Sequence, residues 1–458
     1  MTTSDDERNS LVGRIGRYAR VGAGVGTAAA RVAAGRLVAS GSDRAFEARL
    51  LRNLLGGLKG PLMKVAQFMA TIPDVLPAEY VAELASLQSH APAMGWPFVR
   101  RRMAAELGPD WQGRFASFEQ EAAHAASLGQ VHRAVAHDGE ALACKLQYPD
   151  MQSAVEADLG QLRLAFAVHR RMSPGIDTSE MAAEIGARLR EELDYEREAR
   201  HMALYADILS GYPTIRVPKV RPELSTRRLL TMAWLEGKPL LDFTGADVAT
   251  RNLLATHMFD AWWRPFCGLG VIHGDPHLGN YAAWLDEAGA PQGLNLFDYG
   301  CIRIFPPSFV VGVVELYNGL REDRRDQVVA AYETWGFKGL SNELIDILNI
   351  WARFIYGPLM EDRVRALADG VKAAEYGRKQ AFAVHQALKE KGPVRVPREF
   401  VFMDRAAIGL GAVFIHLRAE LNFYQLFHSA LEGFSAQGVA QRQAAALKRA
   451  GLQPDDRS

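Results

Sequence analysis

Three polar residues in the middle of the chain have the types and the spacing that phosphoryl transfer requires. Asp275 is followed five residues later by Asn280, and an Asp-Tyr-Gly triplet begins at Asp298. In transfer from a metal-bound nucleotide, one carboxylate orients the attacking hydroxyl, while an amide and a second carboxylate hold the metal ions on the phosphates. The step from Asp to Asn is the spacing of a kinase catalytic loop, and the triplet is placed like a metal-binding turn. The pattern therefore predicts a site for an adenine nucleotide, ATP or ADP, with Mg²⁺.

The same residues also have plainer interpretations. A His-Gly-Asp triplet near an Asn is often a loop with local capping, and Asp and Gly both favour turns. His273 and His277 could indicate a transition-metal site. Hard oxygen ligands suit Mg²⁺, however, so we expect Asn280 and Asp298 to be the metal ligands. The apolar run Leu294–Phe297 predicts a short strand that delivers Asp298.

Composition narrows the class of protein. The chain has 458 residues, of which 48% are hydrophobic and 23% are charged, as in a soluble globular protein with more than one compact part. Lys and Arg together number 53, as do Asp and Glu, so bulk binding of nucleic acid is not expected. Cys144, Cys267 and Cys301 have no C-x-x-C spacing, which argues against a zinc site or a disulfide framework and fits a reducing compartment.

Upstream of the catalytic loop, a group of short strands is expected to cover the nucleotide. The pattern predicts strand Phe115–Glu119, a small-residue loop at Ala122–Gly129, strand Gln130–Ala136, a turn at Asp138-Gly139 and strand Ala141–Gln147 with Lys145 in it. Two more strands are predicted at Ile215–Val220 and Arg228–Trp234. Met232 and Trp234, with the hinge Leu235–Gly237, are expected to line the adenine site. This is the order of a kinase small lobe.

The rest of the chain is expected to be helical. One long helix is predicted at Asp177–Leu209, and the helix Asp247–Gly268 leads into the catalytic loop. Further helices are predicted at Ala45–Leu58, Leu62–Ala70, Glu79–Gln88, Pro97–Leu107, Met151–Met172, Val310–Leu320, Asp326–Trp335, Asn342–Tyr356, Val364–Glu390 and Phe400–Leu426.

Several short motifs resemble, in their order, the UbiB/AarF-type atypical kinase-like family. They are KVAQ at Lys64–Gln67, HAASLGQVHRA in the small-residue loop, ACKLQYP around Lys145, ELDYEREA at Glu192–Ala199, HGDPHLGN and FDYG. The chain departs from the family pattern at Ala66, His124, Leu278 and Tyr299, where the family has glycine, alanine, proline and phenylalanine. None of these departures affects Asp275, Asn280 or Asp298.

The resemblance implies roles for the matched residues. Asp275 would be the base or orienting carboxylate. Lys145 would contact the α- and β-phosphates and be held by Glu198. The loop residues that would cover the nucleotide are Ala125, Ala126 and Ser127.

The resemblance also implies that an acidic pair, Glu192 and Asp194, faces the helical extension that carries Lys64 and Gln67. On one continuous helix, Glu192 and Glu198 would lie about 240° apart, at roughly 100° per residue, so they would serve separate partners. The pattern alone leaves Glu191 and Glu196 as alternatives to them.

We therefore expect an α+β, two-lobed protein-kinase-like fold, with an N-terminal helical extension packed across the nucleotide cleft and a mostly helical C-terminal lobe. The expected parts are a flexible or membrane-surface segment (1–43), the helical extension (44–110), a small lobe (111–236), a large lobe (237–450) and a disordered tail (451–458).

By resemblance, the expected function is that of an ATPase or atypical kinase that supports ubiquinone or isoprenoid-lipid metabolism. The expected partners are an adenine nucleotide and a lipid or quinone-precursor small molecule. The expected location is the cytoplasm, with peripheral association at the inner face of a membrane through the acid-poor stretch Leu11–Val38 as an alternative.

Two other functions remain open at this point. One is a small-molecule phosphotransferase of the aminoglycoside or choline kinase type, against which the Lys64–Gln67 motif and the alanine-rich loop argue. The other is a nucleotide-sensing scaffold for a biosynthetic complex. The complete catalytic set argues against a dead scaffold, but it does not argue against a slow enzyme.

Overall fold

The computed structural model describes residues 94–125, 128–156, 159–160, 186–187, 189–337, 339–367 and 398–453. The predictions for Lys64, Gln67, Ala126, Ser127 and residues 1–93 lie outside this range. The chain divides into two compact units. The first lies within Met1–Tyr195 and Pro222–Thr231, and the second within Glu196–Arg221 and Met232–Ser458.

The first unit is built on an antiparallel sheet with the order β1-β3-β4-β6, in which the short strand β2 also pairs with β3. The strands are β1 (Ser117–Phe118), β2 (His124–Ala125), β3 (Gly129–Val135), β4 (Ala141–Gln147) and β6 (Leu229–Ala233). The turn between β3 and β4 contains Gly139, whose φ of +86° is a conformation that glycine adopts without strain.

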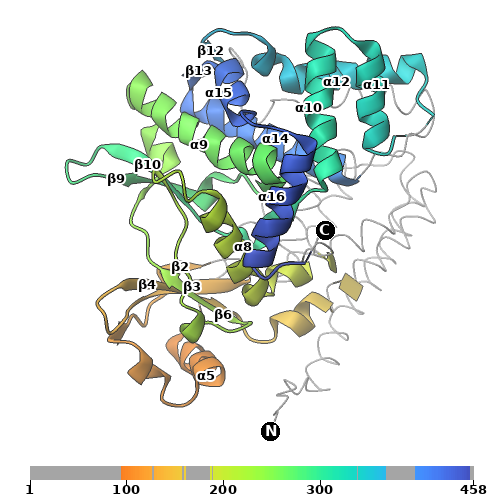
Figure 1. The fold of residues 1–458 in the computed structure, drawn as a ribbon. Coiled ribbons are helices and arrows are strands. Elements are labelled where there is room, and N and C mark those ends of the chain that lie inside the picture. The colour runs from red at the N-terminus through yellow and green to blue at the C-terminus, as the bar shows by residue number, and fades with distance from the viewer. Residues whose placement is uncertain are drawn as a thin grey trace, which may run out of the picture. The chain divides into compact units, whose positions relative to one another are not determined.

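Helix α5 (Trp96–Leu107) packs on this sheet, and the 3₁₀ turn η2 (Trp111–Arg114) follows it (Figure 1). Apolar side chains of α5 and of the sheet share one buried cluster, which includes Val99, Met103, Trp111, Leu142 and Leu146. The alternation of buried and half-buried positions along β3 places every second side chain in or near this core.

The second unit combines a small mixed sheet with a group of helices. The sheet has the order β5-β10-β9-β7, and a separate ladder pairs β8 with β11. These strands are β5 (Ile215–Arg216), β7 (Lys238–Pro239), β8 (Val271–His273), β9 (Tyr281–Leu285), β10 (Pro291–Leu296) and β11 (Ile302–Ile304).

Helix α9 (Val248–Leu269) lies centrally among the helices of the second unit, with α14, α15 and α16 packed against it (Figure 1). Asp247 caps its first turn by accepting from the Thr250 N–H. The other helices are α8 (Tyr195–Ile208), α10 (Pro307–Arg321), α11 (Arg325–Thr334), α12 (Asn342–Met360), α14 (Arg398–Leu417), α15 (Phe423–Ala430) and α16 (Ala436–Arg449).

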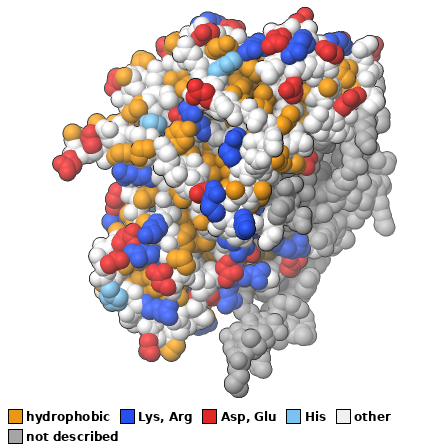
Figure 2. All heavy atoms as spheres, viewed as in Figure 1, with side chains coloured by type: hydrophobic (Ala, Val, Ile, Leu, Met, Phe, Trp, Pro, Cys, Tyr) orange, Lys and Arg blue, Asp and Glu red, His pale blue; other side chains and the backbone are white. Residues whose placement is uncertain are grey.

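The predicted α+β, two-lobed kinase-like fold is confirmed. The strands predicted around Lys145 and the helix before the catalytic loop agree with β3, β4 and α9 within a residue or two. On the visible surface, charges of both signs are interspersed (Figure 2), as the balanced composition suggests. Among the described helices, none has the length and apolar character needed to span a bilayer.

Three helix predictions are wrong in part. The helix expected at Asp177–Leu209 is interrupted at residues 193–194. The helix expected at Phe400–Leu426 ends at Leu417, because Arg418 has a φ of +48° and the strand β13 (Glu420–Leu421) follows. Where a helix was expected from Val364, the chain forms the short strand β12 (Arg365–Ala366), which pairs with β13. The remainder of that predicted helix lies outside the described residues.

Candidate functional site

The catalytic loop of the second unit brings Asp275 and Asn280 together. Strand β8 leads into the loop, and the 3₁₀ turn η5 (Leu278–Asn280) ends it. The Asn280 side-chain amide donates to the Asp275 backbone oxygen at 3.1 Å and to its carboxylate Oδ2 at 3.2 Å. The sequence-predicted pair is therefore within hydrogen-bond contact, with the Asn280 nitrogen turned toward Asp275.

The two histidines of the loop have structural contacts. His277 Nδ1 accepts from the Gly279 N–H at 3.1 Å and so caps η5. His273 is buried, and its Nε2 donates to the Phe297 carbonyl at 3.0 Å, immediately before the Asp-Tyr-Gly triplet. His273 thus ties the catalytic loop to the predicted metal-binding turn.

Asp298 begins that turn in an unusual backbone conformation. Strand β10 ends at Leu296, and Asp298 then has φ +55° and ψ +85°, a region that few non-glycine residues occupy, although Asp tolerates it better than most. The carboxylate of Asp298 accepts from the Gly300 N–H at 3.4 Å, and the 3₁₀ turn η6 (Tyr299–Cys301) follows. A strained conformation at a sequence-predicted site is a functional indicator.

Tyr281 is bonded to the backbone of the Asp275 loop, and the sequence interpretation missed it. Its hydroxyl donates to the Asp275 backbone oxygen at 3.3 Å. Burial raises the pKa of the Tyr281 phenol well above its ordinary value, and the nearby carboxylates of Asp275 and Asp298 raise it further. Both acidic groups therefore act on one buried phenol. Tyr281 directly follows Asn280, but only the folded loop shows its role.

Helix α8 holds the triplet from the other side. Glu198 is 3% exposed, and its Oε1 accepts from the Tyr299 N–H at 3.3 Å. His201, one turn later on α8, donates from Nδ1 to the Tyr299 carbonyl at 3.1 Å. Glu196 is exposed, so the buried carboxylate of this stretch is that of Glu198. Its expected pairing with Lys145 would join the two units and stays a prediction.

The expected helical relation between Glu192 and Glu198 is wrong, because the chain between them is not one helix. The Tyr195 N–H donates to the Arg227 carbonyl at 3.2 Å instead of continuing the helix, and α8 starts there. The Gln147 side chain donates to the Leu193 carbonyl at 2.7 Å and so satisfies the end of the preceding helix. The break separates Glu192 and Asp194 from Glu198, and their roles toward Lys64 and Gln67 remain predictions.

Lys145 lies on β4 in the first unit. Its Nζ is 5.1 Å from the centre of the buried Tyr195 ring, a cation–π distance. Ala125, from the alanine-rich loop, pairs with Gln130 across β2 and β3, so this part of the loop is a short strand and not only a loop.

The predicted hinge, residues 235–237, follows β6 and belongs to the second unit. Met232 forms a bridge with Val220, and residues 234–237 have no regular structure. The Asn295 side chain donates to the Glu236 carbonyl at 2.9 Å. The hinge is therefore fixed by its carbonyl, while the adenine-binding roles of Met232 and Trp234 remain predictions.

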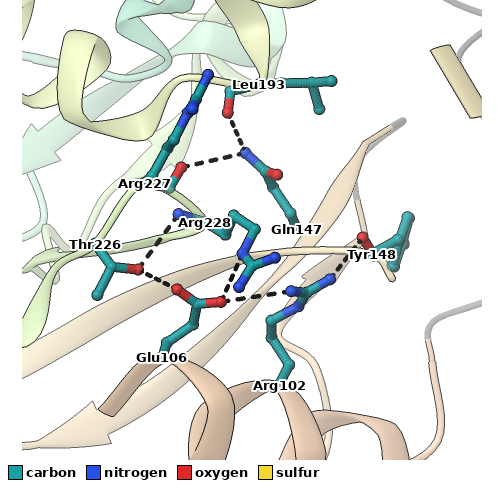
Figure 3. Close-up of polar contacts among 8 residues, drawn as sticks. All are labelled: Arg102, Glu106, Gln147, Tyr148, Leu193, Thr226, Arg227 and Arg228. Carbon is teal, nitrogen blue, oxygen red and sulfur yellow. Dashed lines mark hydrogen bonds and ion pairs between the residues drawn. The ribbon is translucent and has the colours of Figure 1, made fainter. Parts of the chain in front are cut away.

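A charged network in the first unit, which the sequence did not indicate, braces the strands near Lys145 (Figure 3). Glu106 on α5 accepts from Thr226 Oγ1 at 2.6 Å and from Arg228 Nε at 2.7 Å. Arg102 lies 3.4 Å from the same carboxylate and donates to the Tyr148 carbonyl at 3.3 Å. We call Arg102, Glu106, Thr226 and Arg228 the Glu106 network.

The chain is similar in sequence to a family of known proteins. The sequence model of the ABC1 atypical kinase-like domain matches residues 86–332. The chain is 27% identical over 345 residues to the mitochondrial atypical kinase COQ8 of Saccharomyces cerevisiae, covering 73% of this chain and 68% of that protein. It is 30% identical over 278 residues to the AarF domain-containing protein kinase 1 of Gallus gallus, covering 60% of this chain and 53% of that one.

Among solved structures, the chain is similar to Rv3197 of Mycobacterium tuberculosis, which was determined in complex with erythromycin. The TM-score is 0.59 at 26% identity, with 86% of this chain and 96% of that one covered. The chain spans about half the length of several of the curated relatives it matches.

Proposed function

The chain belongs to the ABC1 atypical kinase-like family, and we propose that it binds an adenine nucleotide with Mg²⁺ and transfers or hydrolyses its terminal phosphoryl group. One observation carries the proposal: Asp275 and Asp298, from two separate segments, lie at the same end of the β8–β11 ladder, where the Gly274 N–H donates to the Cys301 carbonyl at 3.0 Å, and Asn280 is bonded to Asp275. That arrangement supplies the orienting carboxylate, the amide and the second carboxylate of a phosphoryl-transfer site.

The donor set fits Mg²⁺. Among the described residues, no three His, Cys, Asp or Glu side chains form a metal-binding group. Mg²⁺ does not require one, because it is usually held by one or two protein oxygens together with phosphates and water. Asp298 and the Asn280 amide oxygen would hold the ion. When bound, it neutralises charge on the phosphates.

The remaining roles follow from the residues themselves. Asp275 would accept a hydrogen bond from the attacking hydroxyl or water and orient it toward the terminal phosphate. Asn280, bonded to the Asp275 carboxylate, fixes the rotamer of that acid. Glu198 and His201 hold both backbone polar groups of Tyr299, so the Asp298 turn keeps its shape. Lys145 would contact the α- and β-phosphates.

For the acceptor, we propose a lipid or quinone-precursor molecule in ubiquinone or isoprenoid-lipid metabolism, with peripheral membrane association. The resemblance to quinone-associated kinases supports this, as does the similarity to the yeast protein named COQ8. The erythromycin complex of the mycobacterial structure makes erythromycin a second acceptor to test, since transfer to it would favour the small-molecule phosphotransferase class.

The proposal is tested by measuring binding of ATP and ADP with and without Mg²⁺, and hydrolysis of ATP with anionic liposomes, a quinone-precursor phenol or erythromycin. Asp298→Asn should lose the Mg²⁺-dependent part of nucleotide binding. In the absence of metal, its free energy of unfolding should equal that of the wild type. Asp286→Asn, at the exposed turn between β9 and β10, is the matched control and should bind normally. Unchanged Mg²⁺ dependence in Asp298→Asn would refute the assignment.

A further inference from the structure

The last of the described helices, α16, places a buried amide behind the catalytic segment. Gln443 is 1% exposed, although its neighbours Gln441 and Arg442 are exposed. Its Nε2 donates to two backbone oxygens, those of Leu269 and Phe305, each at 2.7 Å. The two protons of one neutral amide group therefore satisfy two carbonyls from segments that are distant in sequence.

These two carbonyls mark the same end of one short ladder. Leu269 ends α9, and β8 begins two residues later and leads to Asp275. Phe305 follows β11, which begins four residues after Asp298. The two strands pair antiparallel, with Val271 opposite Ile304 and His273 opposite Ile302. Gln443 therefore closes the ladder at the end opposite to the one where Asp275 and Asp298 lie.

Gly270 shows how closely these segments approach. It has a φ of +70°, and a Cβ there would lie 2.9 Å from the Phe305 oxygen and 3.1 Å from Gln443 Nε2. The Phe305 N–H also donates to the Gly270 carbonyl at 2.7 Å. The end of the ladder is thus a compact junction of three segments, with no room for a longer side chain.

Helix α16 has two further polar contacts in the second unit. Arg442 donates to the Gly268 carbonyl at 3.1 Å, also at the end of α9. Arg449 forms an ion pair with Asp207 at 2.6 Å, near the end of α8. The opposite end of α8 carries Glu198, which holds the Tyr299 N–H. In Figure 1, α16 runs from the side of α9 to that of α8.

We propose that Gln443 is a positioning residue for the phosphoryl-transfer site, through which α16 keeps the Asp275 loop and the Asp298 turn in register. The proposal rests on the function proposed above. Carbonyls at the end of a helix need donors, and a buried carbonyl left without one is costly. Loss of the Gln443 amide would free both strands at once. A one-residue slip of a ladder turns side chains to the opposite face, so its register governs whether the two acids meet.

Gln443→Met tests this, since methionine has nearly the same volume but no donor. Hydrogen exchange should become faster in residues 268–276 and 296–305 together, while helices α11 and α12 keep their protection. The rate kcat for ATP hydrolysis should fall about 10- to 100-fold, because small misplacements of reacting groups are costly, with the KM for nucleotide nearly unchanged. The midpoint of the Mg²⁺ titration should move to higher concentration.

Gln441→Met, exposed on the same helix, is the matched control and should leave exchange and kcat unchanged. Arg442→Ala serves if Gln443→Met fails to fold, because this exposed residue donates to the end of α9 and its loss should loosen residues 268–276. The proposal is overturned if neither segment exchanges faster, or if α11 and α12 loosen equally. If the wild type does not bind a nucleotide, the proposed function is refuted. The Gln443 contact can still be tested in that case, because hydrogen exchange does not depend on catalysis.

Discussion

The two units hold their predicted functional groups by different chemistry. In the first unit, charged side chains brace the strands around Lys145, with Glu106 accepting from Arg228 and Thr226 (Figure 3). In the second unit, neutral donors bind backbone carbonyls of the segments that lead to the acids, and the buried Glu198 carboxylate accepts from the Tyr299 N–H. Trp262 Nε1 donates to the His273 carbonyl at 3.2 Å, and Gln443 donates to those of Leu269 and Phe305.

The difference follows from what each region must hold. The second unit contains Asp275 and Asp298, which are expected to meet metal and phosphate, and it already holds the buried carboxylate of Glu198 beside the Asp298 turn. Neutral donors fix the backbone without adding charge. The expected functional side chain of the first unit is Lys145, and the bracing charges lie on α5 and on the segment before β6. The removal of a charged partner should therefore cost more in the first unit than the removal of a neutral one in the second.

The largest effect is expected from Glu106→Ala. The Glu106 and Arg102 side chains are each 6% exposed, so the substitution leaves a buried guanidinium without its carboxylate. Breaking a buried pair in this way costs about 3–5 kcal/mol. Urea unfolding followed by circular dichroism would measure it.

Asp110→Ala is the control for that measurement. Asp110 is exposed just beyond the same helix and makes no side-chain cap bond, so its removal should change the free energy of unfolding little. If Glu106→Ala were as stable as Asp110→Ala, the Glu106 network would not brace the first unit. The contrast between the two units would then be lost.

A smaller effect is expected from Tyr281→Phe in the second unit. The substitution removes one neutral hydrogen bond, to the Asp275 backbone oxygen, and should cost about 1 kcal/mol. It should also lower the rate of ATP hydrolysis, because the loop that carries Asp275 loses a contact. Thermal unfolding and steady-state kinetics measure the two effects.

Tyr205→Phe is a closely matched comparison. Tyr205 is equally buried and packs against Tyr299, but its hydroxyl has no hydrogen-bond partner among the described residues. Removal of that hydroxyl should be neutral or stabilising, since a buried polar group without a partner is unfavourable. Equal losses in the two variants would mean that the Tyr281 hydrogen bond contributes nothing specific.

The sequence predicts what is local and misses what depends on distant partners. The approximate bounds of β3 and α9 follow from alternation and helical periodicity, which are patterns within a few neighbouring residues. The Asp275–Asn280 contact was predictable because both groups belong to one short loop.

The misses have a common cause. The helix break after Glu192 depends on Gln147 and on the Arg227 carbonyl, both distant in sequence. Nothing near Gln443 or Glu106 in the sequence distinguishes them from surface residues of an amphipathic helix. Only the fold brings Gln443 to Leu269 and Phe305, and Glu106 to Arg228.

The smallest expected effect is a pH dependence that separates the two units. Cys144 in the first unit is fully buried, and burial raises the pKa of its thiol from 9.0 to about 12. Between these values the unfolded chain loses the proton and the folded chain keeps it. The unfolded state then binds fewer protons, so stability is complete below pH 9 and falls as the pH rises toward 12. At pH 9 half of the unfolded thiols are ionised, which lowers the free energy of unfolding by about 0.4 kcal/mol. Each further pH unit lowers it by at most about 1.4 kcal/mol.

The free energy of unfolding should therefore be compared at pH 7.5 and pH 9.5 in the wild type and in Cys144→Ala. The variant loses packing at both pH values, so only the change between them reports the thiol, and this change should be smaller in the variant. Burial also raises the pKa of Cys267 in the second unit, so Cys267→Ala provides the same test there. If the units unfold separately, the Cys144 effect should appear only in the transition of the first unit. The same pH dependence in wild type and Cys144→Ala would show that this thiol is not held protonated in the folded first unit.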